Sequence, residues 1–190
     1  MNPARPVSLA DGDVRASEAW SHAPWTDDFV DIEGDRKERP EWQTRVKMLW
    51  DDEALYLGAW MEVRECFCRE LPSICVPSST LPSPAHRVLV QLPMTRTTRG
   101  PLVQEPCVVA TLRERNSVVF HDNDFEVFLD AEACNHNYYE LEVNALNTIW
   151  ELRLDKPYKN GGSEHSERVG MKGQGNLPNL RTAIKGLVLS

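Results

Sequence analysis

Apolar and polar side chains alternate with a period of two in several stretches of this chain, and this alternation limits the fold more than any other feature. In residues 44 to 50, Val46, Met48 and Trp50 share one face, and two basic residues fall on the other. Successive side chains of a strand point to opposite faces, whereas those of a helix repeat every 3.6 residues. The pattern predicts a half-buried strand with Val46, Met48 and Trp50 on its apolar face.

The same alternation predicts four further strands. They lie at residues 54 to 61, 124 to 130, 138 to 146 and 148 to 154. Three acidic residues, Asp51, Asp52 and Glu53, separate the first two strands, and Asn147 precedes the last one. Asp and Asn disfavour strands and favour turns, so each of these places indicates a hairpin.

No segment with helical periodicity and capping residues lies between the expected strands. Parallel strands need crossover connections, which are usually helices, so the strands are expected to pair antiparallel. The predicted fold is all-β: an antiparallel β-sandwich or jelly roll in a single domain spanning residues 1 to 190.

Charge and hydropathy exclude several classes of partner. The formal net charge is -8 and Lys/Arg-rich runs are absent, which argues against nucleic acid and anionic membrane surfaces. No stretch approaches the roughly 18 consecutive apolar residues of a membrane-spanning helix. The first twenty residues lack the apolar core of a secretory signal, so the chain as written is expected in the cytoplasm, or outside the cell if a leader is missing.

Residues 63 to 104 differ in composition from the rest of the chain. They hold three of the five cysteines and six of the thirteen prolines, and they are weakly basic in an acidic chain. One hypothesis is a long irregular surface loop, although loops of this length are uncommon inside compact domains. The alternative is translated intron sequence, because Val63 and Arg64 can encode a splice donor and Gln104 can end in an acceptor. Sequencing the transcript distinguishes the two.

Residues 120 to 158 combine expected strands with clustered carboxylates, amides and aromatic rings. Alternation places Glu126 and Glu142 on one face of neighbouring strands, and a pair of carboxylates is what glycoside hydrolysis uses. A solvated polar face explains the same residues. Cation binding is a second hypothesis, and it concerns two groups of side chains. Turns and polar strand ends would also explain both groups. These groups are His121, Asp122, Asp124, Asp130, Glu132 and His136, and Asp51, Asp52 and Glu53.

With residues 63 to 104 left out, the sequence resembles the family 9 carbohydrate-binding modules. The resemblance rests on WTDDFVDIEGD at residues 25 to 35, TRVKMLWDDEALYLGAWM at 44 to 61, EEPCVVATLRERNSVVFHDNDFEVFLD, which joins Glu62 to residues 105 to 130, and NHNYYELEVNALNTIWELRLDKPY at 135 to 158. These motifs and their order cover most of the chain outside the insert.

The resemblance implies a sandwich that binds sugar chain ends between aromatic rings without cleaving them, often with calcium bound for stability. Carried over by position, Phe120 corresponds to a clamp aromatic, Glu126 to the sheet carboxylate and Glu142 to the sheet arginine of the modules. The match ends near Ile184, before the last strands of the modules, so the sandwich is expected to be incomplete.

The leading functional hypothesis is non-catalytic carbohydrate binding, with a sugar or polysaccharide chain end as partner and calcium as a structural cofactor. The candidate binding residues are Phe120, Glu126, Glu142 and Asn144. Two alternatives stay open: a protein associated with or performing hydrolysis of O-glycosyl bonds in carbohydrate catabolism, and a protein-interaction β-sandwich whose open edge recruits a strand from its partner.

Overall fold

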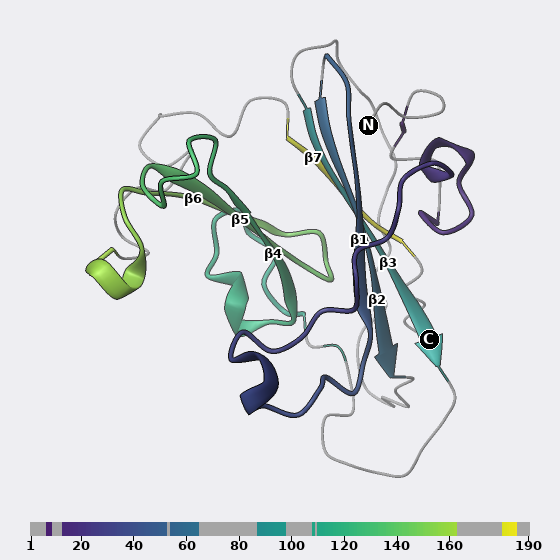
Figure 1. Ribbon diagram of the computed structural model, residues 1–190, viewed down its shortest axis with the longest axis horizontal. Helices are drawn as coiled ribbons and strands as arrows, with labels where there is room; N and C mark the ends of the chain where they lie inside the picture. The colour runs from purple at the N-terminus through teal and green to yellow at the C-terminus, as the bar shows by residue number, and fades with distance from the viewer. Residues whose placement is uncertain are drawn as a thin grey trace. The chain divides into compact units, whose positions relative to one another are not determined.

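The computed structural model describes seven stretches of the chain, shown in Figure 1. They are residues 7–8, 13–52, 54–64, 87–97, 108, 110–162 and 180–185. The chain divides into two compact units: unit 1 comprises residues 1–107 and 179–190, and unit 2 comprises residues 108–178. The expectation of one interrupted domain stays a prediction. In the part of the chain that is described, no helix has the length and apolar character needed to cross a membrane.

Strands make up the regular structure of the described residues, which confirms an all-β fold. They are β1 (Thr44–Trp50), β2 (Ala54–Arg64), β3 (Arg87–Thr97), β4 (Asp124–Leu129), β5 (Tyr138–Asn144), β6 (Ile149–Leu154) and β7 (Arg181–Lys185). The helices found are single 3-10 turns: η1 (Glu18–Trp20), η2 (Gly34–Arg36), η3 (Val119–His121) and η4 (Tyr158–Asn160).

Unit 1 contains a four-stranded sheet in the order β1-β2-β3-β7. The β1–β2 pair is the expected antiparallel hairpin. In its turn the Asp51 carboxylate accepts hydrogen bonds from the Ala54 backbone N–H (2.8 Å) and the Tyr56 hydroxyl (2.9 Å). β3 pairs parallel with both β2 and β7, so the prediction of purely antiparallel pairing is wrong for this sheet.

β3 also changes the description of the segment expected to be irregular, residues 63 to 104. The first two of these residues continue β2, and Arg87–Thr97 form a strand between β2 and β7. The other residues of the segment lie outside the described ranges. Whether the segment is translated intron stays a prediction at the nucleotide level.

The face of β1 expected to be apolar is buried only at Val46, which is 7% exposed. Leu49 is fully buried and Lys47 is 7% exposed, whereas Met48 and Trp50 are 49% and 55% exposed. Lys47 can be buried because its Nζ donates to the Trp20 carbonyl (2.9 Å) and lies over the Trp25 ring. Period two was therefore correct for β1, but assigning Met48 and Trp50 to the core was wrong.

Gly58 in β2 lies where the backbone approaches this core closely. A Cβ added there would be 2.5 Å from Cγ2 of Val14 and 3.1 Å from the Trp20 ring. We expect Gly58→Ala to destabilise the protein by about 1 to 3 kcal/mol, measured by chemical denaturation, because overpacking forces neighbours to shift. Strand propensity alone would make alanine stabilising, so a rise in stability would contradict this packing argument.

Unit 2 contains the antiparallel sheet β4-β5-β6, which matches the predicted strands and hairpin. Residues before β4 cover part of one face: Leu112, Val118 and Val119 pack with apolar residues of β6 and with Tyr138. Those β6 residues are Trp150, Leu152 and Leu154. The register pairs Glu126 with Glu142 and Glu142 with Trp150, so acidic residues lie beside this apolar cluster on the same face.

Candidate carboxylate site

The strand ends in unit 2 are held together by the buried pair Asp122 and Asn144. The Asp122 carboxylate accepts hydrogen bonds from the backbone N–H groups of Thr111 and Leu112 (3.0 Å each), the Thr111 hydroxyl and Nδ2 of Asn144 (2.8 Å). Burial alone would raise the pKa of Asp122, but these hydrogen bonds together hold it below its usual value. We call this hydrogen-bonded pair, Asp122 and Asn144, the bracket; it fixes the start of β4 against the end of β5.

Asn144 is fully buried, and both atoms of its amide are used inside the fold. Nδ2 donates to the Leu112 carbonyl and to Asp122, and Oδ1 accepts from the backbone N–H groups of Leu146 and Thr148. A bound sugar therefore has no free donor or acceptor to reach on this side chain. The expectation that Asn144 contacts sugar is corrected to a structural role.

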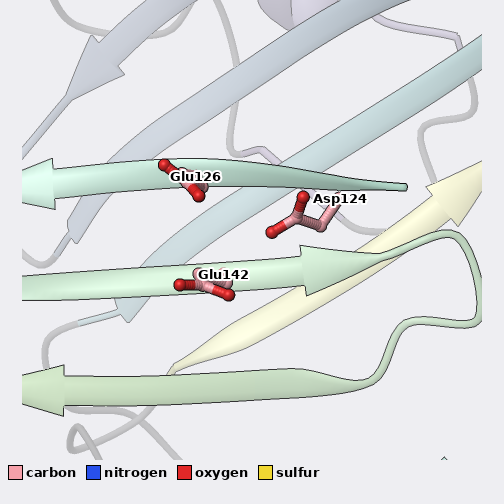
Figure 2. A group of neighbouring side chains, drawn as sticks. All are labelled: Asp124, Glu126 and Glu142. Carbon is pink, nitrogen blue, oxygen red and sulfur yellow. The ribbon is translucent and has the colours of Figure 1, made fainter. Parts of the chain in front are cut away.

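Four carboxylates gather on the same face, next to this bracket. Asp124 and Glu126 lie on β4, and Glu140 and Glu142 lie on β5. One oxygen each from Asp124, Glu126 and Glu142 lies within 4.8 Å of the other two, and Figure 2 shows these three side chains on one side of the two strands. The three carboxylates together could hold a metal ion.

Exposure decreases across the group from β4 to β5. Glu126 is exposed, Asp124 is half-buried, and Glu140 and Glu142 are 4% and 2% exposed. Desolvation and the charge of Glu126 raise the pKa of Asp124 to about 7. Desolvation and the charges of Asp124, Glu126 and Glu140 raise the pKa of Glu142 to about 9, and desolvation also raises the pKa values of Glu126 and Glu140. The surroundings thus raise the pKa of all four carboxyl groups above the ordinary value.

The group is short of hydrogen-bond donors and of positive charge. Oδ2 of Asp124 and the Oε2 atoms of Glu140 and Glu142 are buried without a hydrogen-bond partner. Within the described ranges, the ion pairs join other residues, such as Arg115 with Glu151, and none includes these four carboxylates. Hydrogen bonds with Glu142 and with the Tyr158 hydroxyl partly offset the rise in the pKa of Glu140.

Phe120 provides an exposed aromatic ring beside the carboxylates. It belongs to η3, is 49% exposed, and has its ring centroid 5.7 Å from that of Trp150, the cross-strand neighbour of Glu142. Of the predicted sugar-binding residues, the structure thus places Phe120, Glu126 and Glu142 on one part of unit 2. A ring and several oxygen acceptors are available there to a ligand.

Several of the other residues considered as cation ligands have local roles in the structure. Asp51 serves the β1–β2 turn, and Glu53 lies outside the described residues. The Asp130 carboxylate accepts from the backbone N–H groups of Glu132 and Asn135, and Nδ1 of His136 contacts the Cys134 carbonyl. Among the described residues, the acidic group that could share a metal ion consists of Asp124, Glu126 and Glu142, so it includes only Asp124 of the first group expected from the sequence.

Sequence reasoning missed Glu140 as part of the site, although alternation already put it on the face of Glu142. Its signal was the spacing of two residues within β5. Asp124 precedes Glu126 by the same spacing in β4.

Comparisons of this chain with protein-family models, curated proteins and solved structures find no significant match.

Proposed function

We propose that this protein binds carbohydrate without cleaving it, through the face of β4, β5 and β6 that carries Phe120 and Glu126. The observation that carries the proposal is the exposed Phe120 ring beside the acidic face. Sugar rings stack their C–H faces on aromatic planes, and their hydroxyls donate to carboxylates. Two further parts of the proposal rest on the family resemblance. The strands are arranged as a sandwich or jelly roll, and the ligand is the end of a sugar chain.

The contacts divide by exposure. Phe120 and Glu126 are exposed and would touch the sugar directly, whereas Glu142 is buried and would act through its neighbours. Calcium bound for stability is also part of the proposal, because the resemblance implies it and carboxylate oxygens suit this hard cation.

Removal of the Phe120 ring tests the binding face. We expect Phe120→Ala to weaken binding of glucose, xylose or a short glucan by about tenfold, equivalent to about 1.4 kcal/mol, in calorimetric titrations. Phe29→Ala is the matched control, because Phe29 is 45% exposed but lies in unit 1. Equal affinities of the two variants, or no binding of any of these sugars by the parent protein, would contradict the proposal.

Hydrolysis is the second candidate, because a carboxylate oxygen of Glu126 and one of Glu142 lie within 4.8 Å of each other. Retaining glycosidases hold their two carboxyl groups about 5 to 5.5 Å apart, and a raised pKa suits a general acid. Glu142 is only 2% exposed, however, so a glycosidic oxygen has poor access to it, which favours binding. Turnover of aryl glycosides or glucans that Glu126→Gln and Glu142→Gln abolish would establish hydrolysis instead.

A further inference from the structure

Three carboxylate oxygens on β4 and β5 are spaced as the acceptors of a single ammonium group are. One oxygen each from Asp124, Glu126 and Glu142 lies within 4.8 Å of the other two. The three N–H groups of an alkylammonium point along tetrahedral directions, and charge-assisted N–H···O bonds are about 2.7 to 2.9 Å long. The three acceptors of such a group therefore lie about 4.4 to 4.7 Å apart, which agrees with the spacing found here.

The register of β4 and β5 holds these oxygens in place. Glu126 lies directly opposite Glu142, and Asp124 lies opposite Asn144, one same-face position away. Figure 2 shows the three carboxylates on one side of the two strands. The bracket fixes this end of the ladder. The acceptors are thus preorganised, so a ligand does not have to order a loop to reach them.

The buried side of this group lacks both donors and positive charge. Glu142 is 2% exposed, and among the described residues its Oε2 and Oδ2 of Asp124 have no hydrogen-bond partner. Glu140, 4% exposed and two residues before Glu142 on β5, has an unpartnered Oε2 as well. Sugar hydroxyls would supply donors without charge, whereas an ammonium supplies three donors and the compensating charge.

The titration of Asp124 agrees with a missing cation. Desolvation and then the charge of Glu126 raise the pKa of Asp124 to about 7. A cation close to a carboxyl group favours its ionised form, so a bound ammonium would counteract both causes. Near neutral pH the carboxyl group of Asp124 therefore gives up its proton readily when such a ligand approaches.

Phe120 supplies a surface for the ring that carries the ammonium. Its ring centroid lies 5.7 Å from that of Trp150, and Trp150 is the cross-strand neighbour of Glu142. Adjacent strands lie about 4.8 Å apart, so the aromatic surface and the carboxylates are separated by about the width of one sugar ring. An amine projects from its sugar ring, and it can reach inward to Glu142 while the ring stays on the exposed side, at Phe120 and Glu126.

We infer that the sugar bound by this face is a cationic amino sugar of the glucosamine type, with its ammonium on Asp124, Glu126 and Glu142 and its ring on Phe120. The inference rests on the proposed function and narrows its ligand to sugars with a free amine. Hydrogen bonds between charged partners are about twice as strong as neutral ones. The net charge of -8 also favours the approach of a cationic sugar chain over a neutral one.

Calorimetric titrations with matched trisaccharides test the inference. The ligands are the trimer of β-1,4-linked glucosamine, its fully N-acetylated form and cellotriose, which differ in one substituent of each ring. At about pH 7, where Asp124 titrates, the glucosamine trimer should bind the parent protein at least about tenfold tighter than either neutral trisaccharide. N-acetylation keeps the ring and removes the charge, so this comparison isolates the ammonium.

Three variants separate the charge from the aromatic surface. Glu126→Gln keeps the size and one oxygen acceptor of the side chain, so affinity for the glucosamine trimer should fall roughly fivefold or more, and affinity for cellotriose less than about twofold. Phe120→Ala should weaken both ligands by the same factor, because both stack a ring there. Glu114→Gln neutralises an exposed carboxylate outside β4 and β5 and should bind as the parent does.

Two results would overturn the inference. One is a parent protein that binds cellotriose or the N-acetylated trimer as tightly as the glucosamine trimer, and the other is a preference for glucosamine that Glu126→Gln leaves unchanged. The first result leaves the proposed function standing, because the face then binds carbohydrate without selecting the amine. Absence of binding by all three trisaccharides would remove the inference and the proposed function together.

Discussion

Replacement of Asp122 by alanine is expected to destabilise unit 2 by about 3 kcal/mol or more, a larger loss than that expected for Gly58→Ala. The substitution removes the acceptor of the backbone N–H groups of Thr111 and Leu112 and of Nδ2 of Asn144. Asp122 is 8% exposed and Asn144 is fully buried, so water has poor access to Nδ2 of Asn144 in the unchanged fold. An unsatisfied buried donor costs about 1 to 3 kcal/mol, and several are left here.

Asp130→Ala is the matched control for this experiment. The Asp130 carboxylate also accepts two backbone hydrogen bonds, from Glu132 and Asn135, but it lies in an exposed loop where water can take its place. We expect this variant to lose less than about 1 kcal/mol. Urea denaturation followed by circular dichroism measures both losses, and equal losses in the two variants would contradict the role assigned to Asp122.

The face that carries the carboxylate site could be predicted from sequence because it depends on local rules. A strand puts every second side chain on one face, and short connections join strands that pair antiparallel. Alternation in residues 124–130 and 138–146 was therefore enough to bring Glu126 and Glu142 together, as the β4–β5 register has them. The same rule identified β1, β2 and their hairpin.

What sequence reasoning did not predict depends on contacts between distant residues. Lys47 is buried because its Nζ donates a hydrogen bond to the Trp20 carbonyl and lies over the Trp25 ring, and both residues are more than twenty positions earlier. Asn144 looked like a polar residue free for a ligand, but it joins Asp122 and Leu112 across 22 and 32 positions. β3 pairs in parallel without a helical crossover among the described residues, so no local pattern indicated its place between β2 and β7.

In the presence of a chelator, the free energy of unfolding of unit 2 is expected to fall as pH rises from about 4 to about 9. The pKa values of Asp124 and Glu142 are raised from the ordinary 3.8 and 4.5 to about 7 and about 9, first by desolvation and then by neighbouring carboxylates. Between the unfolded and folded pKa values the folded state holds protons that the unfolded chain has released. The stabilisation that these two protonated carboxyl groups contribute is therefore fully present below about pH 4, and it is lost as pH rises through about 7 and about 9.

The slope of this loss is on the order of 1 kcal/mol per pH unit for each retained proton. Glu126, Glu140 and Tyr158 face the same group, and the carboxyl groups of the first two share its upward pKa shift. Asp122 acts in the opposite direction. Its pKa is lowered, so the stability that its carboxylate contributes is present at neutral pH and is lost only as pH falls below the ordinary pKa of an aspartate. Denaturation at several pH values should show maximal stability on the acidic side, and Glu142→Gln should flatten the decline. A parent protein that gains stability from pH 5 to 8 in chelator would show that these carboxylates are ionised and compensated in the fold.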